Sequence, residues 1–362
     1  MRTIIRILLT AISFFISLAL ITACLAGYIS PKYLWAVAIL GLSFPILFIL
    51  NLLFGAFWLV LWKKEVVISA AGLLCSVWYV PKFASFNNAV NAPAQADTLR
   101  VMTYNVHLFS QYDSGSDQKQ SMLNFIRNEN ADVICFQEFF VLDGKLSEKE
   151  IKRNLRAYPY SFINYTSEQS TRKLKFGTAI FSKHPILNKS EVEFKRSSLN
   201  SSIYADIRVN KDTIRIFCNH LESVKLKEAD KPHRWTERIA NNDLSADNIK
   251  GIVKKLRKAY IIRAEQVDSI KSALDKTPYP TIICGDFNDS PISYTYNTIK
   301  GDLSDAFVVA GSGFTQTYQG LLPTIRIDFI FSDKNIQAYR YRSPKVTYSD
   351  HFPIVVDFYM NK

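Results

Sequence analysis

Hydrophobic and polar positions divide this chain into two regions of different character. Residues 4–80 are almost continuously apolar, whereas short apolar runs alternate with polar stretches from Leu99 onward. Between them lies a polar segment, residues 81–98, which is rich in proline, alanine and asparagine and is typical of a linker. We therefore expect an apolar region at 1–80, a linker at 81–98 and a globular domain at 99–362.

The apolar region contains three runs that predict membrane-spanning helices. They are residues 4–28, 33–62 and 66–80. The first two exceed the roughly 20 apolar residues that cross a bilayer, and the third crosses only with the help of its flanks. Pro45 predicts a kink in the second helix. The first run alone also fits a signal peptide, but because a second long run follows, we expect a permanent anchor.

Basic residues near the three runs predict the orientation of the anchor. Arg2 and Arg6 stand at the start of the first run and Lys63 and Lys64 between the second and third, whereas the loop between the first two runs holds only Lys32. The positive-inside rule places the N-terminus and the Lys63 loop in the cytoplasm. Three crossings would put the globular domain outside the cytoplasm, and it would stay inside if the third run does not cross. We expect an integral protein of a bacterial inner membrane with an extracytoplasmic domain.

From Leu99 onward the pattern predicts ten strands and three helices. The strand-like runs are 99–107, 132–138, 159–165, 176–182, 202–209, 213–221, 280–286, 326–332, 337–342 and 353–359, and the helical ones are 117–129, 147–157 and 249–275. Many strands with few helices indicate an α/β domain with large mixed sheets. The long helix has one apolar stripe, and its basic run KKLRK, residues 254–258, falls mostly on the exposed side, as in a solvated helix face. A long polar insertion at 223–247 is too poor in apolar residues to belong to the core.

Composition narrows the possible partners without choosing among them. The formal net charge is +12, which suits nucleic acid, a phospholipid surface or a phosphorylated small molecule, and which also serves solubility. The five cysteines show no spacing typical of zinc, and Cys135, Cys218 and Cys284 lie inside apolar runs. We therefore expect buried thiols rather than a disulfide framework.

Polar side chains follow or interrupt six of the apolar runs. They are Asn105, Gln137 with Glu138, Asn219 with His220, Asp286 with Asn288, Asp328, and Asp350 with His351. Each cluster alone also has a structural explanation, such as a turn, a strand end or a hydrogen-bonded core histidine. Because loops at strand ends collect catalytic groups on a rigid frame, the repeated pattern predicts one catalytic site.

In the order of these clusters the sequence resembles the endonuclease/exonuclease/phosphatase superfamily. This is the metal-dependent phosphoesterase group of DNase I-like nucleases, abasic-site endonucleases, inositol polyphosphate phosphatases and bacterial sphingomyelinases. The resemblance covers residues 99–360, and its most specific pieces are GDFND at 285–289 and SDHFPI at 349–354. It implies a four-layer α-β-β-α sandwich, in which two packed sheets are flanked by helices, for the catalytic domain that follows the transmembrane region.

The resemblance implies a divalent metal site. Glu138 matches the principal Mg²⁺ ligand of the family, with Asn105 as its neighbour and Asp350 binding or orienting a metal directly or through water. Mg²⁺ prefers a few hard oxygen ligands and keeps several waters, which such a set allows. We expect Mg²⁺ as the cofactor, with Mn²⁺ as an alternative.

The resemblance also implies catalytic roles. Asp286 matches the residue that activates the attacking water, and Asn288 the residue that orients it and the phosphate. His220 matches a phosphate-contacting histidine and proton donor. His351 matches a second such histidine, hydrogen-bonded to Asp328, which would favour the protonated ring. Together with Asn105, the residues Asn288, His220 and His351 are the expected phosphate-binding set.

The sequence therefore predicts a membrane-anchored, divalent-metal-dependent phosphoesterase that hydrolyses a phosphodiester or phosphomonoester with an activated water. Nucleic acid and phospholipids, sphingomyelin included, remain alternative substrates, and we expect no protein partner. His107 stands where abasic-site endonucleases carry an acidic residue, which disfavours DNA repair. The alternative is a catalytically silent phosphate-binding or scaffold domain on the anchor, which would be expected to lack one of the catalytic residues.

Overall fold

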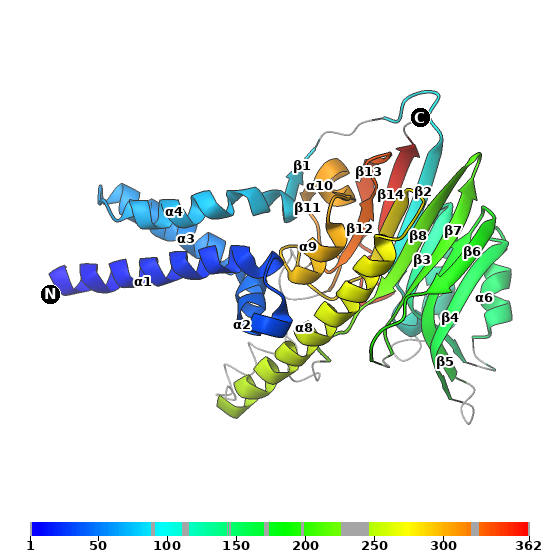
Figure 1. Ribbon diagram of the computed structural model, residues 1–362, viewed down its shortest axis with the longest axis horizontal. Coiled ribbons are helices and arrows are strands. Elements are labelled where there is room, and N and C mark those ends of the chain that lie inside the picture. Colours follow the sequence, from blue (N-terminus) through cyan, green and yellow to red (C-terminus); the bar gives the residue numbers. More distant parts are fainter. Residues whose placement is uncertain are drawn as a thin grey trace.

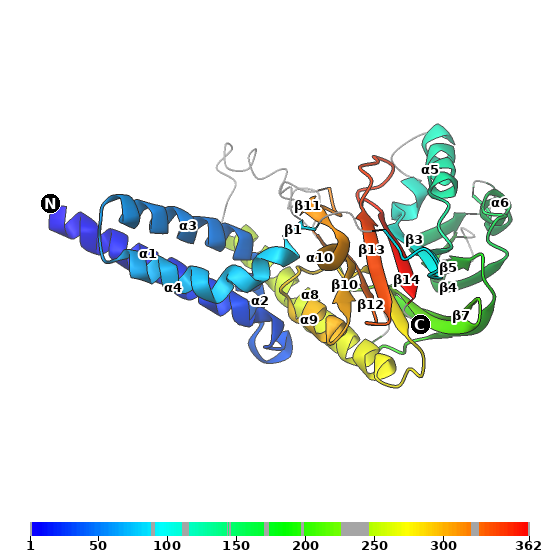
Figure 2. The same cartoon turned by 90° about the horizontal axis from the view of Figure 1, so that it is seen from above.

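The computed structural model describes residues 2–87, 91–110, 116–142, 144, 146–169, 174–196, 199–225, 246–319 and 326–360. Most of the predicted polar insertion at 223–247 lies outside the described residues. Within them, apolar helices at the N-terminus project from one side of a globular domain that holds the strands (Figures 1 and 2).

The N-terminal helices form a bundle. They are α1 (Arg2–Cys24), α2 (Pro31–Leu42), α3 (Phe44–Val60) and α4 (Val66–Ser76), which continues as a 3₁₀ helix, Val77–Lys82. Helices α1, α3 and α4 lie side by side, and α2 lies at the end of the bundle nearest the domain (Figures 1 and 2). The helical segment Thr3–Gly27 is long and apolar enough to cross a membrane. A signal sequence or the core helix of a soluble protein can have the same length and composition.

The second predicted span is not one continuous helix. Residues 33–62 are divided between α2 and α3, which are bent by 54° relative to each other at Ser43. Pro45 stands in the first turn of α3, where its missing N–H costs no hydrogen bond. In a continuous helix its ring would clash with the carbonyl of Gly41, so the chain begins a new helix instead. The kink expected from Pro45 therefore separates a short helix at the domain surface from a 17-residue helix in the bundle.

Polar side chains line the contacts between the bundle helices. The Ser17 hydroxyl oxygen lies 2.5 Å from Asn51 Oδ1 and 2.9 Å from the carbonyl oxygen of Ile68, and the hydroxyls of Ser13 and Ser69 lie 3.2 Å apart. The outward side of the bundle instead exposes large apolar side chains, among them Ile7, Phe15, Leu53, Leu59 and Leu74. Hydrogen bonds between helices inside an apolar exterior are the pattern by which helices associate in a lipid environment.

Two six-stranded sheets form the centre of the domain. The first has the order β13-β14-β2-β3-β5-β4, and the second β10-β12-β9-β8-β7-β6. The first sheet comprises β2 (Thr98–Asn105), β3 (Val133–Leu142), β4 (Tyr160–Gln169), β5 (Leu174–Ser182), β13 (Ile336–Arg342) and β14 (Ile354–Met360). The second comprises β6 (Ile186–Glu191), β7 (Ser201–Val209), β8 (Asp212–His220), β9 (Thr281–Asp286), β10 (Ser304–Asp305) and β12 (Asp328–Ser332). All ten predicted strands are present. The pattern missed β6 because this edge strand is largely exposed and its sequence, ILNKSE, has no apolar alternation.

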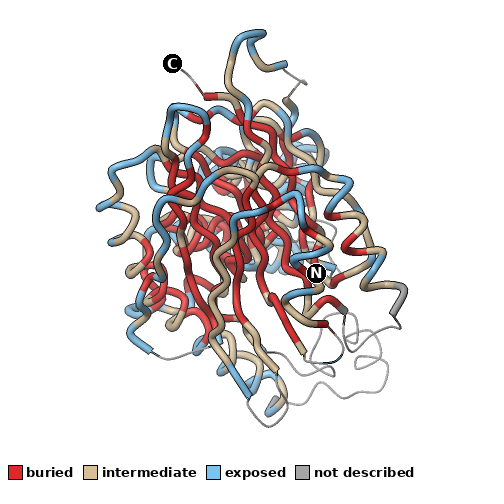
Figure 3. The backbone as a smooth tube through the Cα atoms, turned by 90° about the vertical axis from the view of Figure 1, so that its right-hand side faces the viewer, coloured by how far each residue is buried: buried red, intermediate tan, exposed pale blue. Residues whose placement is uncertain are grey.

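Helices cover the outer face of each sheet and complete four layers. Helices α5 (Ser116–Glu129) and α6 (Glu148–Asn154) bury apolar side chains against the first sheet, and α8 (Ala246–Leu274) and α9 (Tyr294–Lys300) do so against the second. A third apolar cluster fills the space between the sheets. It includes Val101 from the first sheet and Ile216 from the second. The buried backbone in Figure 3 is concentrated in these strands. The four-layer α-β-β-α sandwich that the resemblance implied is confirmed.

Two parallel strand pairs bring the predicted site residues to one edge. In the first sheet β2 runs parallel to β3, and in the second β8 runs parallel to β9, with His220 in register with Asp286. The antiparallel neighbour β12 places Asp328 opposite Asp286. Because parallel strands end at the same edge of a sheet, the loops that follow them share that edge.

The predicted linker is partly ordered against the domain. Residues Ala84–Phe86 form β1, which pairs with β11 (Ser312–Phe314), and Asn87 donates to the carbonyl of Val308 at 2.7 Å. The segment predicted as a linker therefore includes a short stretch, residues 84–87, that pairs with the domain. Composition did not reveal the strand because it has only three residues and β11 contributes Gly313 at a positive φ.

Helix α2 also contacts the domain directly. Its Lys32 pairs with Asp268 of α8, and the guanidinium of Arg257 lies 5.6 Å from the ring of Trp35. Ile292 of the domain is fully buried in an apolar cluster with Phe44 and other bundle residues. The bundle and the domain therefore share a packed interface rather than a bare tether.

Gly285, which precedes the predicted catalytic aspartate, provides a test of this fold. Its φ is +135°, and a Cβ there would lie 2.0 Å from the backbone oxygen of Asn219 on β8. Gly285→Ala should therefore lower the free energy of unfolding by about 3 kcal/mol or more, measured by denaturant titration in detergent. Gly251→Ala is the control, because a Cβ in this α8 position meets nothing within 4 Å and should stabilise by about 0.5–1 kcal/mol. Equal effects of the two changes would contradict the β8–β9 pairing.

Candidate active site

The sequence-predicted residues meet where the central strands of both sheets end. Asn105 and Glu138 come from the first sheet, whereas His220, Asp286 and Asp328 come from the second. Asn288 lies two residues beyond the end of β9, and His351 lies shortly before β14. Asp350 is near this group, on its exposed side.

Asn105 connects the carboxylates of the two sheets. Its side-chain amide donates to Glu138 Oε1 at 3.3 Å and to Asp286 Oδ2 at 3.1 Å. Its Oδ1 accepts from the backbone N–H of His107 at 3.0 Å, and its backbone carbonyl accepts from the hydroxyl of Ser349 at 2.8 Å. In this arrangement Asn105 positions the two carboxylates, and its own side-chain oxygen is directed toward His107.

A bulge in β3 turns Glu138 toward the site. The pairing of β3 with β5 shifts register between Phe136 and Phe139, and Glu138 has a φ of +52°. A bulge bends the strand and redirects a side chain. Gln137 instead lies in the core, where it bonds to Thr103 at 3.0 Å. The Glu138 side chain stays 24% exposed and can therefore reach a ligand.

Asp286 is fully buried, and the loop that follows β9 holds it. The backbone N–H of Asn288 donates to Asp286 Oδ1 at 2.9 Å, and the side-chain amide of Asn288 donates to Oδ2 at 3.1 Å. The same amide donates to the carbonyl of Leu221 at 3.0 Å, which fixes the loop after β8. Burial raises the pKa of Asp286 to about 6, although His351 opposes the shift. A carboxylate with such a pKa is suited to accept a proton near neutral pH.

His351 and Asp328 form a buried pair. His351 Nδ1 lies 3.0 Å from Asp328 Oδ2, and its Nε2 lies 3.7 Å from Asp286 Oδ2. The hydroxyl of Thr317 accepts from the backbone N–H of Asp328 and so fixes the start of β12. Burial alone would lower the pKa of His351, but the carboxylates of Asp328 and Asp286 raise that pKa well above its usual value. The structure thus pairs the residues that the resemblance paired, and it favours an imidazolium.

His220 carries an unsatisfied nitrogen. The side chain is 7% exposed, its Nε2 lies 3.8 Å from Glu138 Oε1, and its buried Nδ1 has no hydrogen-bond partner among the described residues. Because Nε2 faces the Glu138 carboxylate, it is the ring nitrogen through which His220 can meet a ligand of the site.

Asp350 stands apart from the other acidic residues. Its Oδ1 lies 3.8 Å from His107 Nδ1 and accepts from the hydroxyl of Ser349 at 3.4 Å. Its backbone carbonyl accepts from the N–H of Gln319 at 2.8 Å, and its charge helps to raise the pKa of His351. Its expected role in metal binding stays a prediction.

Arg263 is a supporting residue that the sequence analysis missed. It is 1% exposed, donates to the carbonyl of Glu222 at 2.8 Å and to Asp289 at 3.1 Å, and so connects the loops after β8 and β9. Asp289, the last residue of GDFND, thereby has a structural contact and also accepts from Thr295 at 2.8 Å. The available signal was an arginine on the apolar stripe of α8, three residues after Tyr260.

The donor set of the site fits a divalent cation. Glu138 and Asp286 share a single amide donor, and Asp286, Asp328 and His351 have possible ligand atoms within 4.8 Å of one another. These carboxylate oxygens carry negative charge that a bound cation would neutralise. Mg²⁺ prefers hard oxygen ligands of this kind. His351 already uses Nδ1 for Asp328, so Glu138 is the better ligand. The Glu138 side chain is also more exposed than those of Asp286 and Asp328.

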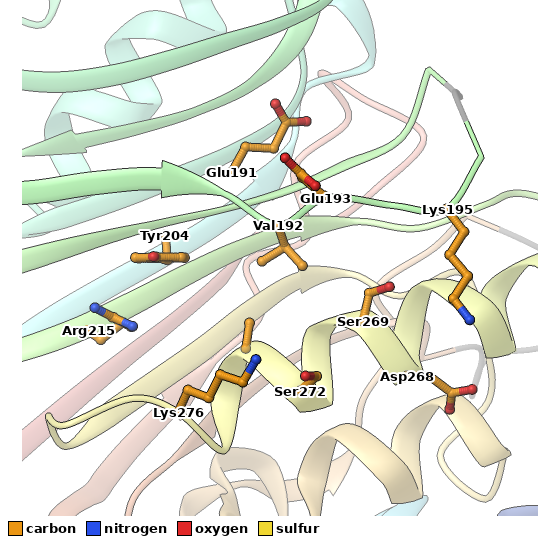
Figure 4. A pocket seen from close by; sticks show the side chains of 11 residues that line it. Glu191, Val192, Glu193, Lys195, Tyr204, Arg215, Asp268, Ser269, Ser272 and Lys276 are labelled. Carbon is orange, nitrogen blue, oxygen red and sulfur yellow. The ribbon is translucent and has the colours of Figure 1, made fainter.

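A second hollow lies away from this site, between α8 and the second sheet. Figure 4 shows it lined by both acidic and basic side chains, and its volume is about 650 Å³. Arg215 on its wall is paired with Asp206 at 2.6 Å and lies 4.1 Å from the ring of Tyr204. Since these charges neutralise one another and none of the six clusters contributes to it, the hollow does not compete as a catalytic site.

Comparison with known proteins identifies the family of the domain. A model described as the Endonuclease/Exonuclease/phosphatase family matches residues 102–351, which include every predicted site residue. A second model, described only as a domain of unknown function, matches residues 6–83. No protein with a curated description matches the chain.

Solved structures share the fold at low sequence identity. An endonuclease/exonuclease/phosphatase from Beutenbergia cavernae is 18% identical, with a TM-score of 0.54, covering 73% of this chain and 72% of its own. The catalytic domain of human Nocturnin, solved with a bound sulfate anion, is 15% identical, with a TM-score of 0.54. The match covers 75% of this chain and 97% of the Nocturnin domain. A mannosyl-6-phosphatase from Bacteroides thetaiotaomicron is 16% identical, with a TM-score of 0.50. The match covers 72% of this chain and 99% of the phosphatase. Likeness at this identity shows the fold.

The His351–Asp328 pair can be tested through the protonation of the ring. In metal-free protein, Asp328→Asn should lower the pKa of His351, measured by NMR titration of the histidine ring carbons. Because the folded-state pKa lies above the unfolded value of about 6.5, the stabilisation is complete below that pH and is lost as pH rises through the folded pKa. The stability gap between wild type and variant should therefore shrink as the solution becomes more alkaline. Asp302→Asn, an exposed carboxylate outside the site, is the control. An unchanged pKa in Asp328→Asn would contradict the pairing.

Proposed function

Because the chain belongs to the endonuclease/exonuclease/phosphatase family, we propose that it is a membrane-anchored, divalent-metal-dependent phosphoesterase. It hydrolyses a phosphodiester or phosphomonoester with an activated water. The observation that carries the proposal is the convergence of a buried Asp286, a paired His351 and an accessible Glu138 at one edge of two sheets. A silent scaffold would have no need to bury these charges together, since burial of an ionised group is costly.

Asp286 is the proposed general base. Its pKa near 6 lets it take a proton from water at neutral pH, and the amide of Asn288 lies close enough to orient that water and a phosphate oxygen. The new bond joins the water oxygen to phosphorus, and the bond to the leaving alkoxide breaks.

The two histidines are the proposed phosphate contacts. His351, kept cationic by Asp328, stabilises the charge that develops on the phosphoryl oxygens. His220 presents Nε2 beside Glu138, and this nitrogen can hold a phosphate oxygen or donate a proton to the leaving group. A divalent cation held by Glu138, with Asn105 and Asp350 as further expected ligands, would neutralise phosphoryl oxygens and assist departure of the alkoxide.

The bundle of α1, α3 and α4 is the proposed membrane anchor. Its apolar outer surface and its interior hydrogen bonds suit lipid, and Arg6 in α1 pairs with Glu65, the residue just before α4. Since α4 runs back toward the domain, the N-terminus and the Lys63 loop share one end and the domain lies at the other. This arrangement supports three crossings and an extracytoplasmic domain of an inner-membrane protein, acting on a phospholipid or a nucleic acid.

Metal dependence is the direct test of the catalytic proposal. The full-length protein in detergent, with Mg²⁺ or Mn²⁺, should hydrolyse at least one of bis-p-nitrophenyl phosphate, plasmid DNA, RNA, sphingomyelin and phosphatidylinositol phosphates. Chelation by EDTA should abolish the activity, because the cation neutralises the phosphate. Glu138→Gln should raise the Mg²⁺ concentration for half-maximal rate about tenfold or more, the scale of a lost metal ligand.

Glu191→Gln is the matched control, since this exposed glutamate on β6 lies outside the site and should leave the Mg²⁺ requirement unchanged. Full activity in EDTA would contradict metal-assisted hydrolysis. Absence of hydrolysis of every substrate in the presence of metal would favour a silent phosphate-binding domain.

The proposed orientation predicts opposite behaviour of two reporter fusions in a bacterial host. Alkaline phosphatase, which is active only outside the cytoplasm, should be active when fused after Lys362 and inactive when inserted after Lys64. The reason is that the domain and the loop between α3 and α4 lie at opposite ends of the anchor helices. A fluorescent protein that matures only in the cytoplasm is the complementary control and should show the reverse. Activity of both phosphatase fusions, or of neither, would contradict three crossings.

A further inference from the structure

The N-terminal half of α8 carries a basic face that the catalytic site does not use. Residues 246–258 hold five basic side chains and one acidic side chain. Lys250, Lys254, Arg257 and Lys258 recur at the spacing that places them on one side of a helix, and all four are exposed. We call this set the basic face of α8. Lys254, Arg257 and Lys258 make no ion pair with any residue in the described part of the chain, whereas Lys250 lies 3.8 Å from Asp247.

This face stands beside the proposed anchor. Figure 1 shows the N-terminal end of α8 next to α2, on the side of the domain from which the bundle projects. The contact is specific, because Arg257 of the basic face lies 5.6 Å from the ring of Trp35 in α2, and Lys32 pairs with Asp268 farther along α8.

Helix α2 has the character of an interfacial helix. Tyr33 is 86% exposed, and Leu34 and Leu42 are about half exposed. Aromatic side chains concentrate where lipid headgroups meet the hydrocarbon, and helices that lie in this plane expose apolar residues toward the acyl chains and basic residues toward the headgroups. Ile249, also half exposed, adds an apolar side chain at the start of α8.

We propose that the basic face of α8 binds anionic phospholipid headgroups of the leaflet nearest the domain. The inference rests on the membrane insertion proposed above. Lysine and arginine side chains within a Debye length of an anionic bilayer are attracted to it, and α2 holds this face at the level where the chain leaves the bundle. The sign of the charge and the apolar neighbours both suit the lipid surface.

A lipid surface fits this face better than a nucleic acid does. A polyanion in solution would have to approach between the domain and the bilayer, and it would gain nothing from exposed Tyr33, Leu34 and Ile249. The lipid contact has a further effect on the site, because Arg263, five residues after Lys258, holds the loops that follow β8 and β9. Headgroup binding thus steadies the helix that supports the catalytic loops.

Residue-resolved labelling of lysine amines tests the proposal. The full-length protein is reconstituted in nanodiscs of phosphatidylcholine, alone or mixed with phosphatidylglycerol, and labelling rates are measured by mass spectrometry. Labelling of Lys254 and Lys258 should be slower by about twofold or more in the anionic discs. The difference should vanish in about 1 M NaCl, where the Debye length falls to about 3 Å. Lys149, Lys211 and Lys334, exposed on other elements, should be labelled equally in both discs.

A matched pair of variants supplies a second measurement. Ligand binding to the folded state raises the melting temperature, so wild type should melt higher in anionic than in zwitterionic discs. The triple change Lys250→Gln, Lys254→Gln and Lys258→Gln should lose most of this increment. The control triple change Lys149→Gln, Lys211→Gln and Lys334→Gln should keep it.

Equal labelling of the basic face in both discs would overturn the proposal while leaving the anchor and the hydrolysis intact. Failure of the protein to enter the discs at all would overturn the anchor and this inference together. Protection that requires added duplex DNA rather than anionic lipid would assign the face to nucleic acid and overturn the lipid assignment. Equal protection by inorganic phosphate in phosphatidylcholine discs would overturn it as well.

Discussion

The proposed catalytic groups come from two separate sheets, so the distance between the sheets sets the geometry of the candidate site. Asn105 depends directly on this distance. Its side-chain amide, on the first sheet, donates both to Glu138 beside it and to Asp286 on the second sheet. The apolar cluster between the sheets fixes their separation, and protein interiors are packed densely enough that the loss or gain of one methyl group is felt. The packing of the core between the sheets therefore sets the geometry of the proposed catalytic site.

The site also concentrates features that are unfavourable for folding. Glu138 and Asn288 both have positive φ angles, and Asp286 keeps a buried carboxyl whose pKa lies near 6. Such backbone conformations cost roughly 1–3 kcal/mol each and persist only where the surroundings hold them. Here the surroundings are the paired β8 and β9, the α8 arginine Arg263 and the apolar layers on both faces. The stability of the sandwich offsets the strain that the site requires.

The sequence predicted the parts of the molecule whose cause is local. Strands with an apolar run, such as those ending at Asn105 and Asp286, were recognisable, and the order of polar clusters indicated the site. Features that depend on distant partners were not recognisable. The three-residue β1 exists because β11 pairs with it, and Arg263 is tolerated on an apolar stripe because Asp289 and the Glu222 carbonyl satisfy it. The break at Ser43 was expected only as a kink, since Pro45 does not reveal where the first half of the helix will lie.

The direct docking of the domain on the bundle determines how the enzyme meets its substrate. A domain on a flexible linker turns its opening in every direction and searches a volume set by the length of that linker. Here β1, α2 and the contact of Arg326 with the carbonyl of Lys82 hold the domain at one tilt. In the proposed membrane only lateral diffusion and rotation about the bilayer normal remain. The opening of the proposed active site then stays at a constant height above the lipid. The height at which a substrate lies therefore matters as much as its concentration.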